Sequence, residues 1–500
     1  MEQCVPKCKI ARNLNHGSDH LPIITTFTTS SNHISKTKIS AYNFEKTNWD
    51  LLKAKAKENL SRINCTRIPS PATVDQLAEE IINALEAAIA CSTPRKRICP
   101  FSKRWWNEKL MEARREANRL RNTYKRTGDE EIGKEWKEKV KEYKTEIKKA
   151  KKEKWRTYVK EADETTIWKL KKYMDSTSTS TYIPTIGTAA SNDEKAETFR
   201  STFFPQPPPA DLNDIQTAIY PEAVPTPPTI TPSQIRTAIE KLAPKKALGP
   251  DEIPNLVLKK CYDEIKDYLL LLAQESLEMG HFPKAFKESI TLVFRKPKKP
   301  DYTKPNAYRL IALKSTIGKV LESIVAETIS YLTETHELLL DTHFGGRPCR
   351  TAEDAMMLLT ENIHSAWREK MVYSAVFMDI SGAFNNVHHK RLIHNLRKRR
   401  IPEPLVRWIE SFLQNRTTWL NFNGTRSSSF PTPAGIPQGS PLSSILYIYY
   451  NADLLEIQIP GTTPHLSLGF IDDIGYGVKS ITTTGTIAKL EKIMAEAEQW

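Results

Sequence analysis

Residues 466–478 read LSLGFIDDIGYGV, and they place two adjacent carboxylates, Asp472 and Asp473, inside an apolar stretch punctuated by glycine. The pattern predicts two short strands that meet at a tight turn. Ionised carboxylates beside buried strands are costly unless they are paired or bind a metal ion. Because an isolated Asp-Asp pair is most often a solvated turn, its interpretation depends on the rest of the sequence.

A second acidic site lies upstream, where the apolar run Val376-Phe377-Met378 ends at Asp379. Strand-borne carboxylates that converge can hold two divalent cations roughly 3.5–4 Å apart and promote in-line nucleotidyl transfer. Between the two acidic sites, residues 434–442 read AGIPQGSPL. The glycines allow the backbone to approach a ligand closely, and the first proline fixes the path of the chain beside them.

Basic residues precede both acidic sites. Residues 294–297 read FRKP and residues 308–313 read YRLIAL, and their Lys and Arg side chains can grip a triphosphate. Residues 344–348, FGGRP, come just before a segment with helical periodicity. These motifs and the two acidic sites follow one another in a definite order along the second half of the chain.

The order and spacing of the motifs resemble those of reverse transcriptases from LINE-type (non-LTR) retrotransposons, from about residue 248 to residue 500. The resemblance implies an α+β fold with the fingers and palm of a right-hand polymerase and an antiparallel palm sheet. A mostly helical basic region would precede these, and the thumb would be missing. The implied function is RNA-directed DNA synthesis, in which dNTPs are joined to the 3′ end of a primer.

The resemblance also assigns catalytic residues. Asp379 matches the aspartate of motif A, and Asp472 and Asp473 match the paired aspartates of motif C. Asp379, Ile380 and Asp472 would bind two Mg²⁺ ions, for which Mn²⁺ is a possible substitute. Asp473 would assist the metal site and orient the primer end.

Five further residues match positions that contact the incoming nucleotide in this family. Phe384 matches the bulky residue that blocks a ribose 2′-OH, although alone it would be taken for an ordinary core aromatic. Gln438, followed by Gly439, matches the glutamine that contacts the nucleotide. Lys296 and Arg309 match the residues that hold its phosphates, although Lys296 has equally basic neighbours.

Three positions depart from the usual pattern of the family. Asn385 stands where aspartate is common, Leu310 replaces the proline of Arg-Pro-Ile, and Glu252 replaces the last glycine of Gly-Pro-Asp-Gly. None of these changes removes an expected metal ligand. Two other functions stay open: a degenerate or domesticated polymerase fold that binds nucleic acid without catalysis, and a maturase-like RNA splicing factor.

The amino-terminal residues 15–23, NHGSDHLPI, resemble the last motif of the apurinic-type endonuclease domain that precedes the polymerase in these elements. There the histidine, His20 here, acts in phosphodiester hydrolysis, and Asp19 would orient it. We expect a remnant of that domain over residues 1–30. An alternative takes these residues as zinc ligands: Cys4, Cys8, His16 and His20. The loop between the two pairs is far shorter than the roughly 12 residues of the usual finger.

The composition agrees with a nucleic-acid partner. The 500 residues contain 73 Lys and Arg against 59 Asp and Glu, a net charge of +14, which favours a polyanion such as an RNA template and a DNA primer or target. Seven cysteines without a repeated Cys-x-x-Cys indicate a reducing compartment. We find no signal peptide and no apolar run that approaches a membrane span. The nucleus or cytoplasm, as a ribonucleoprotein, is the expected location.

Composition along the chain predicts four parts. The endonuclease remnant is followed by a helical basic region over residues 31–175, with helices at 73–90 and, interrupted near Gly128, at 103–159. A low-complexity and proline-rich linker spans residues 176–230 and contains a short helical piece. The fingers and palm occupy residues 231–500, beginning with a helix start at Thr231-Pro232-Ser233.

The last segment has helical periodicity. Its apolar stripe consists of Ile487, Leu490, Ile493, Met494 and Ala497. In the resembled family this helix leads to a strand with a lysine and then to the thumb. We therefore expect the stripe to lack its partner, and the chain to fold imperfectly and extend primers feebly.

Overall fold

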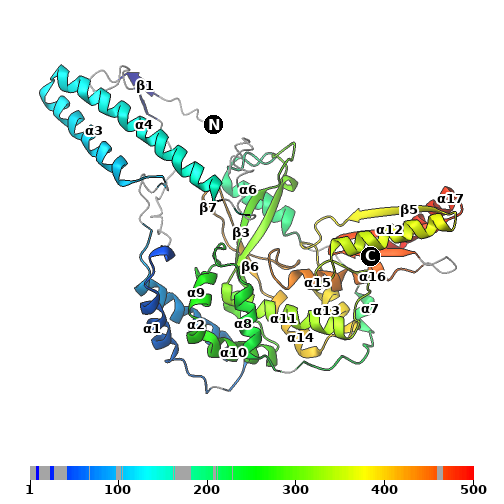
Figure 1. The fold of residues 1–500 in the computed structure, drawn as a ribbon. Coiled ribbons are helices and arrows are strands. Elements are labelled where there is room, and N and C mark those ends of the chain that lie inside the picture. The colour runs from blue at the N-terminus through cyan, green and yellow to red at the C-terminus, as the bar shows by residue number, and fades with distance from the viewer. Residues whose placement is uncertain are drawn as a thin grey trace. The chain divides into compact units, whose positions relative to one another are not determined.

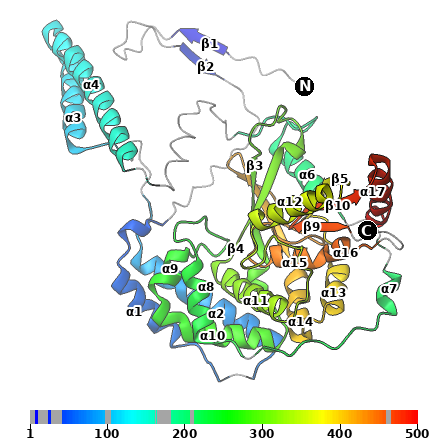
Figure 2. The same ribbon diagram turned by 45° about the vertical axis from the view of Figure 1, so that its right-hand side comes forward.

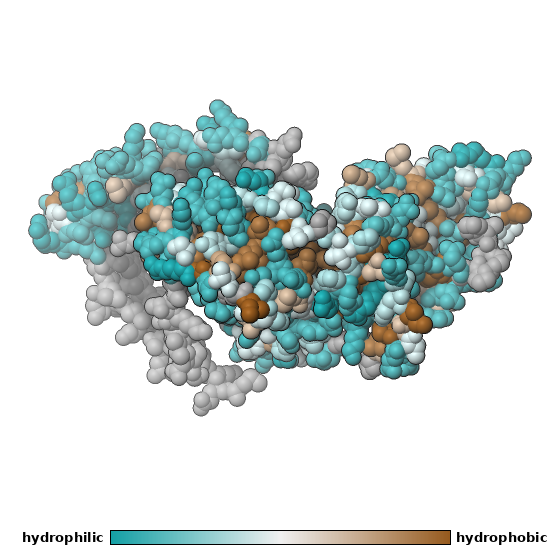
Figure 3. All heavy atoms as spheres, turned by 90° about the horizontal axis from the view of Figure 1, so that it is seen from below, coloured by the Kyte–Doolittle hydropathy of each residue, from teal (hydrophilic) through white to brown (hydrophobic). Residues whose placement is uncertain are grey.

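The structure, a computed structural model, describes residues 7–10, 23–26, 42–66, 68–96, 103, 105–161, 163, 182–206, 210, 212–227, 229–458 and 465–500 (Figures 1 and 2). The chain separates into two compact units: Met1–Asn43 with Arg95–Thr157, and Phe44–Pro94 with Tyr158–Trp500. None of the helices in the described ranges combines the length and hydrophobicity of a membrane-spanning segment. The face drawn in Figure 3 is mainly hydrophilic, with hydrophobic residues gathered in patches.

The first unit contains a strand pair and a helical hairpin. β1 (Lys7–Ile10) pairs antiparallel with β2 (Ile23–Thr26). α3 (Glu108–Thr127) and α4 (Glu130–Lys160) lie side by side in both ribbon views. The predicted interruption is confirmed, because Gly128 ends α3 in the left-handed conformation, with φ +69°. Aromatic side chains pack between the two helices, where the ring of Tyr124 stacks on that of Trp136.

The helix predicted over residues 73–90 is confirmed as α2 (Pro71–Ser92), which Ser70 caps. It packs with α1 (Trp49–Leu60) against α10 (Tyr262–Glu278) of the second unit. A carboxylate oxygen of Asp75 accepts a hydrogen bond from the Lys284 backbone N–H at 2.7 Å. Residues 44–94 therefore fold with the second unit, whereas the sequence placed them with α3 and α4 in one basic region. The charge of the sequence alone did not distinguish the packed pair of helices, α1 and α2, from the more exposed pair, α3 and α4.

The second unit opens with helices at the expected places. Thr231 begins α8 (Pro232–Lys241) with a capping box to Gln234. Two further helices follow, α9 (Asn255–Lys260) and α10 (Tyr262–Glu278), which are divided at Cys261. Glu252, the departure from glycine, has φ +50°, and a non-glycine residue is disfavoured there by roughly 1–2 kcal/mol. This strain accounts for glycine as the usual choice at the position.

A five-stranded sheet holds the basic motifs. The antiparallel pair β3 (Glu288–Arg295) and β4 (Tyr308–Lys314) is extended by β6 (Thr417–Phe422), which runs parallel to β3. β7 (Thr425–Arg426) and β8 (Phe430–Pro431) complete the sheet by pairing with β6. The sheet is therefore mixed rather than purely antiparallel.

Helix α6 (Asn192–Phe203) packs on this sheet, although the sequence placed its residues in a linker. Phe199 is fully buried, with ring centroids 5.2 Å from Tyr308 and 5.7 Å from Phe422. The short helical piece expected between the proline-rich stretches is α7 (Asn213–Gln216), which Asp214 joins to Arg391 of α13. The prolines near α6 thus favoured a linker, although α6 contributes to a hydrophobic core.

A separate three-stranded sheet, ordered β5-β10-β9, is antiparallel throughout. Its strands are β5 (Val372–Asp379), β9 (Leu466–Phe470) and β10 (Asp473–Ser480). The helices around it are α11 (Thr316–Thr335), α12 (Ala352–Arg368), α13 (His389–Lys398), α14 (Glu403–Leu413), α15 (Ser443–Tyr450), α16 (Ala452–Leu455) and α17 (Thr483–Ala497). In Figure 1, α12 and α17 lie along β5, which both helices contact.

The expectation that the last apolar stripe lacks a partner is wrong for most of its members. Ile493 is buried, and Leu490, Met494 and Ala497 pack with it against β5 and β10. Ile487 alone of the five is largely exposed, at 49%. The sheet itself covers the stripe, because β5 presents Val376 and Met378 to α17.

We expect Phe199→Ala to lower the free energy of unfolding of the second unit by about 3–5 kcal/mol, because it leaves a cavity among three aromatic rings. Glu197→Ala, on the exposed side of the same helix, should change it by less than about 0.5 kcal/mol. Urea denaturation followed by tryptophan fluorescence measures both. Equal stability of the two variants would mean that α6 is only loosely attached.

Candidate active site

The register of β5 and β10 brings the acidic motifs together. Asp379, the last residue of β5, lies directly opposite Asp473, the first residue of β10. Residues directly opposite in an antiparallel pair point to the same face, here the face away from the core with Ile474 and Met378. Asp472 lies in the turn between β9 and β10, so two strands far apart in the sequence place three carboxylates at one edge of the sheet.

The turn that carries Asp472 is held in an unusual conformation. Ile471 has φ +58°, which is rare for a β-branched residue and is maintained only by its surroundings. The side-chain amide of Asn451 donates a hydrogen bond to the Ile471 carbonyl at 2.7 Å. Below the turn, a β-carbon at Gly345 would come within 2.6 Å of the Ile471 nitrogen. The FGGRP motif therefore supports the turn through close backbone contact.

An open cavity of about 1350 Å³ lies beside the carboxylates. Residues from five regions of the chain line it, among them Lys296, Arg309, Asp379, Ile380, Phe384, Gln438 and Asp472. Basic side chains from the mixed sheet thus share one cavity with carboxylates from the antiparallel sheet. Such a pairing can bind a phosphate chain and the cations that accompany it.

The electrostatics of the site suit a divalent cation. Partial burial, followed by the nearby charges of Asp473 and Asp379, raises the pKa of Asp472 above its usual range. A bound cation would relieve this repulsion, and hard oxygen ligands suit Mg²⁺. Ile380 can contribute only its backbone carbonyl, which also accepts a hydrogen bond from the Ala383 N–H at 3.3 Å.

The protein ligands are too few to form a complete cage. Within the described ranges, no three His, Cys, Asp or Glu side chains converge closely enough to hold a metal ion by themselves. Mg²⁺ is commonly held by one or two carboxylates together with substrate phosphates. The residues present therefore fit a cation that arrives with a nucleotide.

The loop over residues 434–440 is fastened to the turn after Asp379. The N–H groups of Gly435 and Ile436 donate to the carbonyls of Val387 and Phe384, at 2.9 and 2.8 Å. Gly435 has φ +77°, and a β-carbon there would lie 2.6 Å from the Asn385 carbonyl oxygen. This glycine is required by both conformation and space.

A buried ion pair also supports the loop over residues 434–440. Glu322 of α11 is fully buried, forms a salt bridge with Lys314, and accepts a hydrogen bond from the Ser440 hydroxyl at 2.5 Å. Burial, opposed by Glu322, lowers the pKa of Lys314 to about 7. Sequence reasoning did not identify this triad, because its members lie in three separate segments.

Phe384 does not stand alone. Its ring stacks on Tyr447 of α15, with centroids 5.2 Å apart and an interplanar angle of 20°. Burial and the nearby Asp472 carboxylate raise the pKa of Tyr447. Its buried hydroxyl has no hydrogen-bond partner in the part of the chain that the structure describes. Tyr447 therefore supports Phe384 by packing, a role that only the spatial arrangement reveals.

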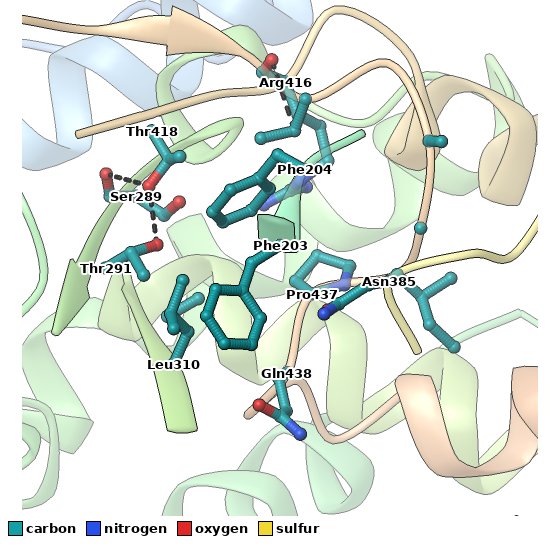
Figure 4. Close-up of a pocket in the computed structure, with 15 residues that line it drawn as sticks. Phe203, Phe204, Ser289, Thr291, Leu310, Asn385, Arg416, Thr418, Pro437 and Gln438 are labelled. Carbon is teal, nitrogen blue, oxygen red and sulfur yellow. Dashed lines mark hydrogen bonds between the residues drawn. The ribbon is translucent and has the colours of Figure 1, made fainter. Parts of the chain in front are cut away.

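A second, smaller cavity adjoins the first. Figure 4 shows the rings of Phe203 and Phe204, from the end of α6, beside Pro437 and Gln438. Phe203 and Gln438 line both cavities. The segment that the sequence treated as a linker thus forms part of the wall of the candidate site.

Two expected residues, Asp473 and Gly439, do not line the main cavity, and a further group falls outside the described residues. Asp473 lines an apolar groove with Met356, Phe377 and Phe470 instead. Gly439 has φ +107° and is not among the lining residues. Asp19 and His20, together with the zinc ligands considered as an alternative, have no described side chains.

Comparisons with known proteins agree with this geometry. Residues 296–500 match the family of reverse transcriptases (RNA-dependent DNA polymerases). "Probable RNA-directed DNA polymerase from transposon BS" of Drosophila melanogaster is 33% identical over 221 residues, 44% of this chain and 24% of that protein. The RNA-directed DNA polymerase from mobile element jockey of the same species is 28% identical over 280 residues, 54% of this chain and 30% of that protein.

A third similarity extends over nearly the whole chain. A 115 kDa protein in the type-1 retrotransposable element R1DM of Drosophila melanogaster is 24% identical over 508 aligned residues, 97% of this chain and 47% of that protein. This chain therefore spans from about a quarter to about half of the length of these relatives. Residues 296–500 are a reverse transcriptase domain. The domain is of the kind found in non-LTR retrotransposons.

We expect Gly435→Ala to destabilise the protein more than Gly424→Ala. Both glycines have positive φ, +77° and +75°, but a β-carbon at Gly424 meets nothing within 4 Å. Gly424→Ala should cost about 1–2 kcal/mol, and the clash with the Asn385 backbone should add about 1–3 kcal/mol at Gly435. Chemical denaturation compares the two, and equal losses would mean that the loop moves freely away from the turn.

Proposed function

We propose that this chain catalyses RNA-directed DNA synthesis, joining dNTPs to the 3′ end of a primer with two Mg²⁺ ions. The observation that carries the proposal is the single cavity in which Asp379 and Asp472 face Lys296 and Arg309. Reverse transcriptases use divalent metal ions, which activate the 3′-OH and neutralise the leaving pyrophosphate. Mn²⁺ would be a possible substitute for Mg²⁺.

In this proposal the antiparallel sheet is the palm, and the mixed sheet with α6 belongs to the fingers. Asp379, Asp472 and the Ile380 carbonyl hold the metal ions. Lys296 and Arg309 bind the phosphates of the incoming nucleotide, because they line the same cavity as the carboxylates. Asp473, which does not line this cavity, would orient the primer end.

Sugar selection follows from packing. Phe384 lines the cavity, and the ring of Tyr447 stacks against it. The Phe384 ring therefore cannot easily move aside for a ribose 2′-OH. Gln438 contacts the nucleotide from the loop, whose position the Glu322 and Gly435 contacts fix. The two alternatives, a non-catalytic nucleic-acid-binding fold and a maturase-like splicing factor, require template binding but no nucleotide addition.

We expect Asp379→Asn and Asp472→Asn each to reduce primer extension on an RNA template by at least about 10³-fold, because each removes a charge that the metal ions need. Template binding, measured by filter retention, should change less than about twofold, since many basic residues share it. Asp267→Asn, at an exposed position on α10, is the matched control. Polymerisation within tenfold of the parent would exclude the two-metal assignment and favour the non-catalytic alternatives.

A second prediction concerns sugar choice. Phe384→Ala should raise the efficiency of rNTP relative to dNTP incorporation by about tenfold or more, a shift of about 1.4 kcal/mol. Tyr447→Ala should produce a smaller shift in the same direction, whereas Tyr447→Phe, which keeps the ring, should not. Single-nucleotide insertion kinetics measure these ratios. If the ratio of rNTP to dNTP efficiency were unchanged in Phe384→Ala, Phe384 would only pack in the core and would not select the sugar.

A further inference from the structure

Helix α4 sorts its residues by type around its circumference. Its 31 residues include twelve Lys and Arg against seven Glu. The half-buried residues Trp136, Val140, Tyr143 and Ile147 recur three or four positions apart, which places them on one face. Tyr143 contacts Trp106 and Trp136 contacts Tyr124, so this face is the one that packs within the hairpin.

A second face carries a row of exposed basic residues. We call it the basic row: Lys137, Lys141, Lys144, Lys148 and Lys152. Their spacings of four, three, four and four residues keep them on one stripe that continues to Trp155, which is 44% exposed. The stripe from Lys137 to Trp155 is roughly 27 Å long at 1.5 Å per residue. Apart from Glu130 at the start of the helix, the glutamates of α4 lie on a different part of its circumference.

The basic row is unfavourable for the helix itself. Lys137 and Lys141, Lys144 and Lys148, and Lys148 and Lys152 are like-charged pairs four residues apart, each costing roughly 0.2–0.5 kcal/mol. Within the described part of the chain, the ion pairs of α4 join Lys134 to Glu131 and Lys139 to Glu142, both at 2.9 Å. Neither includes a lysine of the row. A solvated helix stabilised by its own salt bridges would not concentrate charge in this way.

We propose that the basic row binds the phosphate backbone of single-stranded RNA, with Trp155 stacking on an unpaired base. Lysines along one face neutralise successive phosphates, and aromatic side chains beside a cationic surface stack on bases that are not paired. The row needs no contribution from the catalytic cavity. The choice of RNA over another polyanion rests on the proposed function, whereas the charge arrangement does not.

The test uses the full chain and a single-stranded RNA of about 20 nucleotides, without dNTPs or divalent metal, so binding is separated from catalysis. One variant replaces the five lysines of the basic row by glutamine. A matched control makes the same five-charge change off the row, at Lys109, Lys125, Lys139, Lys149 and Lys160. Circular dichroism establishes that both retain helix content.

We expect the row variant to bind at least about tenfold more weakly near 100 mM salt. Its slope of log affinity against log salt should fall by up to about 3.5, since single strands contribute roughly 0.7 per phosphate contact. The control should lose less than about threefold. If the row variant and the control lost equal affinity for RNA, net charge alone would explain the effect, and the proposal would be overturned. Undiminished binding by the row variant would also overturn it, in favour of an acidic protein partner.

Trp155→Ala gives an independent check on the strand state. It should weaken binding of single-stranded RNA by about fivefold to a hundredfold, a stacking loss of about 1–3 kcal/mol. Binding of an RNA duplex of equal length should stay within about twofold. Equal losses of affinity for the single strand and the duplex would show that Trp155 does not stack on an unpaired base. The preference for single strands would then be wrong.

Discussion

Three negative charges must be kept together at the edge of a small sheet, and much of the second unit serves this constraint. The β5–β10 pairing sets Asp379 against Asp473, and the left-handed backbone at Ile471 brings Asp472 beside them. Because the pKa of Asp472 is raised by burial and by both neighbours, the arrangement stores repulsion that a cation relieves. The Asn451 amide and the backbone near Gly345 hold the turn against that repulsion.

The same constraint explains why the site is assembled from two sheets. Carboxylates alone would attract cations but not a nucleotide. The basic residues come from a different sheet, since Lys296 directly follows β3 and Arg309 lies on β4. The loop with Gly435 and Gln438 joins them, hydrogen-bonded to the turn after Asp379 on one side and to Ala312 of β4 on the other. Rigidity of this loop, anchored by Glu322, therefore controls the geometry of both halves.

Local patterns predicted the local structure well. Alternating apolar residues and a turn predicted the hairpin around Asp472, apolar periodicity predicted α2, and the Thr231-Pro232-Ser233 pattern predicted the start of α8. What the sequence did not predict depends on contacts between distant segments. The parallel pairing of β6 with β3, the attachment of α6 through Phe199, and the support of Phe384 by Tyr447 leave no periodic signal. The proline content led to a wrong prediction, because it assigned the residues of α6 to a linker.

The strand pairing at the site also constrains the length of the chain. Side chains on a strand alternate between faces, so loss of one residue from β5 would turn Asp379 toward the core beneath α17. Loss of two would restore the face but move the carboxylate about 7 Å along the strand. In copies of a mobile element that accumulate small in-frame deletions, these eight residues therefore tolerate almost no change of length, even where the three aspartates themselves survive.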